Sequence, residues 1–161
     1  MQAASNFNSR TGGCVRVVER TTESDYIAIT SGSGCWSYVG RQGGRQELNL
    51  QRGNPGCVFP GIVEHEMLHA LGTWHEQSRP DRWRGGSLFL SKILRIIIFS
   101  HRDQYVRINW ENIRSGTEHN FEAKNPSDVL LHGGYDYGSV MHYSRCAFTQ
   151  NNLETITPLV R

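Results

Sequence analysis

The chain has 161 residues, 37% of them hydrophobic, and a formal net charge of +2 at pH 7 with charges of both signs interspersed. A chain of this length can bury one sizeable core, so we expect a single domain over residues 1–161. The small mixed charge gives no case for a nucleic-acid partner or for binding to an anionic membrane surface.

The first fifty residues are expected to form part of a sheet. Residues 1–13 are polar, end in Gly12-Gly13 and could be the tail of a helix. Gly43-Gly44 is typical of a hairpin turn. The stretches with strand character lie between turns and cover residues 14–19, 26–30, 35–39 and 46–50.

The segment that follows carries a metal-binding pattern. His65 and His69 are four residues apart, so on a helix over residues 61–72 both imidazoles project from one face and can reach one ion. Glu66 points elsewhere, which suits a carboxylate that takes a proton from metal-bound water. Alone, this short pattern could also belong to an ordinary amphipathic helix with two surface histidines.

Gly72 and His75 extend the pattern. A straight helix would carry His75 about 15 Å along the axis from His65, at a rise of about 1.5 Å per residue. Gly72 can end the helix, because glycine enters the left-handed conformation of a C-cap at little steric cost. The chain can then turn back and present His75 as a third ligand. Three protein ligands leave zinc an open position for water, which is the arrangement of a catalytic site.

These residues resemble a known family. The extended motif from His65 to His75 is that of the metzincins, and Glu76 directly after the third histidine resembles the astacin branch. The run Ser139-Val140-Met141-His142-Tyr143 resembles the astacin Met-turn. Two further stretches are similar to astacins, especially vertebrate hatching enzymes: residues 20–26 and 32–40.

The resemblance implies a zinc-dependent metalloendopeptidase with one Zn²⁺ per chain that hydrolyses peptide bonds of extracellular proteins. Glu66 would be the general base and then the acid. Tyr143 would be an additional zinc ligand that leaves the metal when substrate binds and donates a hydrogen bond to the oxyanion. The implied metal ligands are therefore His65, His69, His75 and Tyr143.

The resemblance also assigns positions around the metal. Met141 would lie beneath the ion, and in astacins the freed mature N-terminus is buried near the glutamate that matches Glu76. The family's sheet has an edge strand at about Trp36, Ser37 and Tyr38 that pairs with extended protein or peptide substrate. Main-chain pairing of this kind gives affinity with little sequence preference. Simple packing is the alternative role of the two aromatic residues.

The four cysteines form no C-x-x-C pair, so nothing indicates a thiolate metal site. By the resemblance, Cys35 and Cys57 are bonded to each other, and closing a loop of about 22 residues would stabilise the fold by roughly 3 kcal/mol. Cys14 matches a family position whose usual partner lies beyond the end of this sequence, and Cys146 does not fit the family pattern. These two could pair with each other, with another chain, or not at all.

Residues 83–102 depart most from the family. Similar astacins run directly from a segment like Arg79–Arg82 into one like Asp103–Asn109. The insertion contains a mostly apolar run over residues 88–99, which is too short for a membrane span of about 20 residues. As a helix this run would present a wide apolar face, and as strands an aggregation-prone edge. We expect it not to be a functional element.

The resemblance implies an α+β zincin catalytic domain with a twisted mixed sheet, an active-site helix and a more irregular lower subdomain. We expect the domain to be incomplete at both ends. The cysteines and the protease motif favour an extracellular, secreted protein, although the N-terminus has no apolar signal-peptide region. The alternatives are a catalytically inactive or unstable fragment that is at most a binding surface and, less well supported, an intracellular zinc-binding module.

Overall fold

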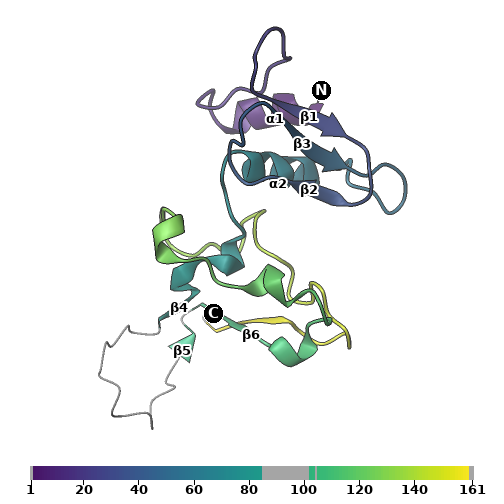
Figure 1. Ribbon diagram of the computed structural model, residues 1–161. Helices are drawn as coiled ribbons and strands as arrows, with labels where there is room; N and C mark the ends of the chain where they lie inside the picture. The colour runs from purple at the N-terminus through teal and green to yellow at the C-terminus, as the bar shows by residue number, and fades with distance from the viewer. Residues whose placement is uncertain (1, 85–101, 104, 160–161) are drawn as a thin grey trace. The chain divides into compact units, whose positions relative to one another are not determined.

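The computed structural model describes residues 2–84, 102–103 and 105–159. The chain divides into two compact units, Met1–Trp74 and His75–Arg161 (Figure 1). The apolar run over residues 88–99, for which a helix or strands were the alternatives, lies outside the described residues.

The first unit contains a three-stranded sheet of order β1-β3-β2. The central strand β3 (Arg45–Leu50) pairs in parallel with β1 (Tyr26–Thr30) and antiparallel with β2 (Cys35–Ser37) (Figure 1). Three of the four predicted strands are therefore confirmed, and β2 and β3 form the predicted hairpin. The polar N-terminal segment forms helix α1 (Gln2–Arg10), which confirms the predicted helix tail.

The prediction of a strand over residues 14–19 is wrong, because a side chain takes the place of a strand partner. The Oδ1 of Asn8 accepts the main-chain N–H of Val17 at 2.6 Å, and its Nδ2 donates to the carbonyl of the same residue at 3.0 Å. Val15 and Val17 still pack against the core of this unit. The alternating apolar residues of this segment are thus explained by packing against the core and not by pairing with another strand.

Helix α2 (Pro60–Ala70) packs against the sheet and against α1. It begins with Pro60 in its first turn, where a missing N–H removes no intrahelical hydrogen bond. The ion pair between Arg10 and the buried Glu64, at 2.7 Å, joins α1 to α2. The buried residues of this core come from both helices, the sheet and the intervening loop: Phe7, Leu48, Leu50, Cys57, Val63 and Met67.

The predicted disulfide between Cys35 and Cys57 is present. It ties the start of β2 to the loop before α2, so it fastens the sheet edge to the segment that leads into the helix. Cys14 and Cys146 are both exposed and are free thiols.

The second unit consists mostly of short elements, which agrees with the irregular lower subdomain that the sequence predicts. Its core centres on the fully buried Phe121, with Val106, Ile113 and Ile156 around it. Strands β6 (Val106–Ile108) and β7 (Ile156–Pro158) pair antiparallel. The 3₁₀ helices are Glu76–Ser78, Pro80–Arg82, Trp110–Asn112, Glu118–Phe121 and Pro126–Asp128.

The two ends of the predicted insertion meet in a short antiparallel pair. Strand β4 (Trp83–Arg84) pairs with β5 (Arg102–Asp103), with Trp83 opposite Asp103. Next to this pair, the N–H of Tyr105 donates to the carbonyl of Arg82 at 3.1 Å. The described residues that flank 85–101 are therefore neighbours in the second unit.

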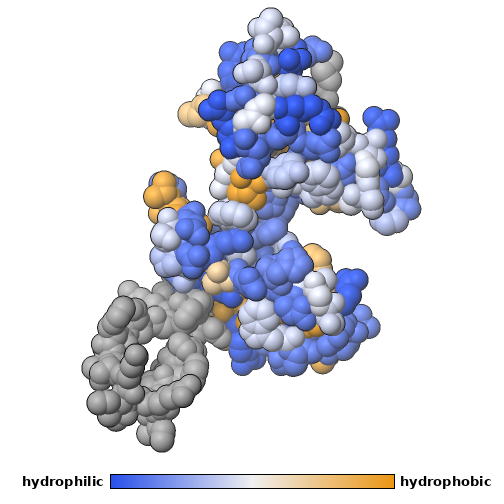
Figure 2. Space-filling model, in the orientation of Figure 1, coloured by the Kyte–Doolittle hydropathy of each residue, from blue (hydrophilic) through white to orange (hydrophobic). Residues whose placement is uncertain are grey.

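Hydrophilic residues cover much of each unit in the view of Figure 2, with small apolar spots between them. Within the part of the chain that the structure describes, no helix has the length and apolar character needed to cross a bilayer.

Candidate metal centre

Helix α2 places His65 and His69 side by side, with ring centroids 4.7 Å apart. The Nδ1 of His69 lies 2.8 Å from the carbonyl oxygen of Thr73, and because a carbonyl can only accept, Nδ1 carries the proton. Nε2 is then the unprotonated nitrogen, the form in which imidazole binds a metal. Burial lowers the pKa of His69, against the hydrogen bond to Thr73, which raises it, and the neighbouring His65 lowers it further.

The turn after α2 depends on Gly72. Its φ is 100°, in the left-handed region that side-chain-bearing residues rarely adopt. The N–H of Gly72 donates to the carbonyl of His69 at 2.8 Å, and the N–H of Thr73 donates to that of Leu68 at 3.0 Å. This closure ends the helix and leads the chain toward His75, as the sequence predicts.

His65, His69 and His75 each offer a ring nitrogen, and these atoms all lie within 4.8 Å of one another. With Zn–N bonds of about 2.0 to 2.1 Å, two nitrogens on a tetrahedral zinc lie about 3.4 Å apart. The three side chains are thus grouped closely enough to hold one ion after small rotations. Three imidazole donors suit zinc and leave a coordination position for water.

Glu66 is a buried carboxylate next to the first ligand. Its residue is 4% exposed, and its Oε2 has no hydrogen-bond partner among the described residues. Burial raises the pKa of Glu66 to about 7. An unpartnered buried carboxylate oxygen is unfavourable for folding alone, and a carboxylate that titrates near neutral pH can both take and return a proton. The residues present therefore fit a hydrolytic metal site.

Tyr143 and His75 lie against each other in the second unit, with ring centroids 4.3 Å apart. The phenol ring also contacts Phe121 and Phe148. Met141 is 2% exposed, and its carbonyl accepts the N–H of Glu76 at 3.0 Å. The structure thus brings the Met-turn next to the segment that carries the third histidine.

The carboxylate of Glu76 has partners of its own in this unit. Its Oε1 accepts the N–H of Asp136 at 2.9 Å and lies 3.3 Å from the Arg79 guanidinium. Arg79 also forms a two-pronged pair with Asp81 at 2.9 Å. Glu76 therefore connects the third-ligand segment to the loop before the Met-turn.

The predicted substrate-binding residues lie at an edge of the sheet in the first unit. Strand β2 pairs with β3 on one side and is the last strand in the order on the other. Trp36 and Tyr38 are 40% and 50% exposed, and their rings meet edge to face at 5.9 Å. Substrate binding by Trp36, Ser37 and Tyr38 stays a prediction.

Sequence reasoning missed Gln77. This residue is fully buried, and its Oε1 accepts the main-chain N–H of Tyr143 at 3.1 Å. A glutamine two positions after a histidine ligand belongs to no pattern that indicates such a contact. Its place directly after the extended motif was the one signal that could have drawn attention to it.

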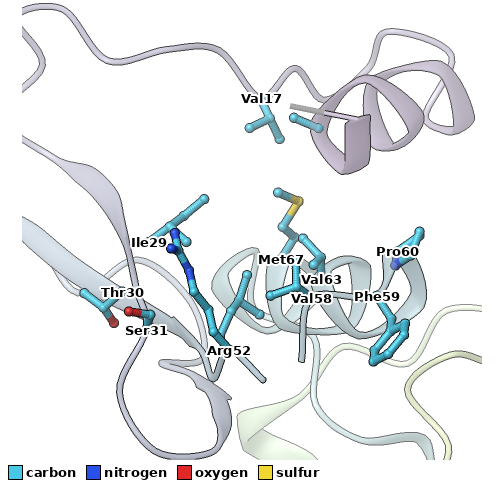
Figure 3. A pocket seen from close by; sticks show the side chains of 12 residues that line it. Val17, Ile29, Thr30, Ser31, Arg52, Val58, Phe59, Pro60, Val63 and Met67 are labelled. Carbon is cyan, nitrogen blue, oxygen red and sulfur yellow. The ribbon is translucent and has the colours of Figure 1, made fainter. Parts of the chain in front are cut away.

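A cavity of about 540 Å³ in the first unit lies away from these histidines. Figure 3 shows Val63 and Met67 of α2 beside it, with Met67 pointing toward Val17. Positions two residues apart on a helix differ by about 200°, so Val63 and Met67 occupy the helix face opposite His65. The cavity belongs to the apolar side of α2 and not to the metal centre.

Comparison with known proteins decides the family. The model of the Astacin peptidase family matches residues 1–94 and 99–161. The chain belongs to the astacin family. This astacin is 44% identical over 154 residues to high choriolytic enzyme 2 of Oryzias latipes, covering 95% of the chain and 46% of the relative. It is 43% identical over 146 residues to meprin A subunit beta of Homo sapiens, covering 89% of the chain and 17% of the relative.

A solved structure agrees with the sequence match. High choriolytic enzyme 1 of Oryzias latipes, described as a hatching enzyme zinc-protease, superimposes with a TM-score of 0.79 at 42% identity, covering 99% of this astacin and 68% of that chain. The predicted α+β metzincin fold is thereby confirmed. The chain spans about half the length of the choriolytic enzymes that it matches, at 46% and 47%.

Proposed function

We propose that this astacin is a zinc-dependent endopeptidase that hydrolyses peptide bonds of extracellular proteins. The observation that carries the proposal is the group of His65, His69 and His75, whose nitrogens lie within 4.8 Å of one another, with the buried Glu66 beside the first of them. These histidines would hold the zinc, which would supply Lewis-acid chemistry and lower the pKa of a bound water to about 7.

Glu66 acts as the general base. It accepts a proton from the attacking water and later gives that proton to the leaving amine. Because burial raises its pKa to about 7, both transfers are accessible near neutral pH. Tyr143 would be an additional ligand of the bound metal, and its phenolic O–H would donate a hydrogen bond to the oxyanion that develops on the substrate carbonyl.

The exposed edge of β2 binds the substrate chain. An extended peptide adds to Trp36, Ser37 and Tyr38 through main-chain hydrogen bonds, with the two aromatic rings as lateral contacts. The similarity to high choriolytic enzyme 1, which is described as a hatching enzyme, favours a hatching-enzyme-like role for this astacin. The disulfide between Cys35 and Cys57 supports an extracellular location.

In this proposal residues 1–161 form a single partial catalytic domain with an atypical insertion at 83–102. The competing proposal is an inactive fragment that acts at most as a binding surface. Metal stoichiometry separates the two, because an unassembled site would not hold an ion.

The test is native mass spectrometry of the purified chain with zinc, followed by cleavage assays on unfolded protein substrates. We expect one zinc per chain and metal-dependent cleavage. His69→Ala should lose both, whereas His119→Ala, which changes an exposed histidine, should keep both. Absence of zinc in the unmodified chain would refute the proposal in favour of the inactive fragment.

A further inference from the structure

Side chains hold both main-chain polar groups of Tyr143. The N–H of Tyr143 donates to Oε1 of Gln77 at 3.1 Å. The carbonyl of Tyr143 accepts a hydrogen bond from Nδ1 of His142 at 2.6 Å. Hydrogen bonds to side chains, and not those of a helix or sheet, therefore hold the peptide groups on either side of this residue.

The second ring nitrogen of His142 also has a hydrogen-bond partner. A carbonyl can only accept, so Nδ1 of His142 carries the proton and Nε2 is an acceptor. The hydroxyl of Tyr135 lies 2.7 Å from Nε2 and donates to it. Tyr135, His142 and the carbonyl of Tyr143 thus form a directed chain of hydrogen bonds.

Tyr135 is well fixed in its own place. Its ring stacks on Tyr105 with centroids 4.9 Å apart and meets Tyr137 at 5.0 Å. Burial, followed by the nearby carboxylate of Glu76, raises the pKa of Tyr135 above its ordinary value, so its hydroxyl keeps its proton. The donor end of the chain is present throughout the working pH range.

The main-chain N–H of Tyr143 is bonded to a buried side chain. Gln77 is fully buried, and its own carbonyl accepts a hydrogen bond from Arg82 at 2.6 Å. Gln77 lies two residues after His75, so the same segment carries the third metal ligand and the contact to Tyr143. A phenol that changes partners by rotating its side chain requires a stationary main chain, because a shift of about 1 Å at a reacting group can cost about 100-fold in rate.

We propose that Tyr135 is a positioning residue that fixes the main chain of Tyr143 through His142. The proposal rests on the function proposed above for Tyr143 and adds a residue outside the proposed metal ligands and substrate-binding residues. Tyr135 affects the reaction only through the position of the Tyr143 main chain, from which the phenol side chain rotates.

The kinetic test removes one hydroxyl at a time. Tyr135→Phe keeps the ring and its stacking, and we expect kcat to fall about tenfold while KM stays within about twofold. Tyr137→Phe is the matched control, since it keeps the ring contact with Tyr135 and removes a hydroxyl that donates to the carbonyl of Tyr105 at 2.7 Å. We expect that control to match the unmodified protein.

A double-mutant cycle tests the route through His142. In a His142→Phe background the chain is already broken, so adding Tyr135→Phe should change kcat by less than about twofold. Two independent, multiplying losses would mean that Tyr135 acts by another path and would overturn the proposal.

A spectroscopic readout separates this proposal from the peptidase function. In the Cu²⁺-loaded chain, a coordinated Tyr143 gives a visible phenolate-to-copper absorption band, which Tyr143→Phe should remove. We expect Tyr135→Phe to shift or weaken the band and Tyr137→Phe to leave it unchanged. If the chain showed these band changes but no cleavage activity, the positioning role would be supported and the peptidase proposal would be refuted. Equal bands and equal kcat in the two variants, or no band in the unmodified chain, would overturn the positioning role.

Discussion

The Oδ1 of Asn49 accepts the main-chain N–H of Gly32 at 2.6 Å, so a residue of the central strand holds the loop that leads into the sheet edge. The Nδ2 of Asn49 donates to the carbonyls of Gly34 at 2.7 Å and Ser33 at 3.1 Å. Asn49 is 2% exposed. The start of β2, and with it the proposed peptide-binding edge, is therefore held in part by one buried amide.

Replacing Asn49 by Ala should destabilise the chain by about 2 to 4 kcal/mol, because the N–H of Gly32 and the carbonyl of Ser33 lose this partner at once. Asn49→Asp should also destabilise it, since a carboxylate would face the carbonyls of Ser33 and Gly34. Thr30→Val is the control, because it removes a single contact to Oδ1, at 3.0 Å. Urea unfolding followed by circular dichroism measures these changes, and a loss in Asn49→Ala no larger than that in Thr30→Val would contradict the prediction.

The metal centre could be predicted from the sequence because its determinants are local. The spacing of His65 and His69 follows from the helix period, and Gly72 supplies the left-handed turn that allows His75 to follow. The disulfide between Cys35 and Cys57 came from the family resemblance and is confirmed. These features need only short-range geometry or matched positions.

The contacts that could not be predicted join side chains to distant main-chain groups. Asn8 occupies the place of a strand partner for Val17, and Gln77 reaches the N–H of Tyr143 across 66 positions. Such bonds leave no periodicity in the sequence, because a single polar side chain makes the hydrogen bonds that a neighbouring strand would otherwise make. The error at residues 14–19 has this cause.

Deleting residues 83–102 should leave the second unit folded. Trp83 pairs with Asp103, and Tyr105 bonds to Arg82, so joining Arg82 to Asp103 closes a short gap. We expect unchanged zinc stoichiometry and a free energy of unfolding that is equal or up to about 3 kcal/mol higher, since a loop of about 20 residues no longer has to be closed.

The matched control for this deletion replaces residues 85–101 by a Gly/Ser segment of equal length. If the insertion has no function, the control should keep the metal and the activity of the full chain. Loss of zinc or of cleavage in both variants would show that the insertion contributes to the site and would rule out our interpretation.

Glu66→Gln should lower kcat/KM by at least about 100-fold while zinc stoichiometry stays at the level of the unmodified chain. The amide is similar in size to the carboxylate but cannot take a proton from water. Glu111→Gln, which changes an exposed glutamate, is the control and should retain activity. Zinc loss in Glu66→Gln would indicate a structural role, and retained cleavage would refute the assignment of the base.

The buried carboxyl of Glu66 should also make the stability of the chelated, zinc-free chain depend on pH. Burial raises its pKa from 4.5 to about 7, so between these values the folded chain holds a proton that the unfolded chain has released. The stabilising contribution is fully present below about pH 4.5 and is lost as pH rises through about 7, which amounts to at most about 3 kcal/mol. Urea unfolding between pH 5 and 8 measures the decline. Glu66→Gln should flatten it and Glu111→Gln should not; equal slopes in the two variants would show that another group causes the dependence.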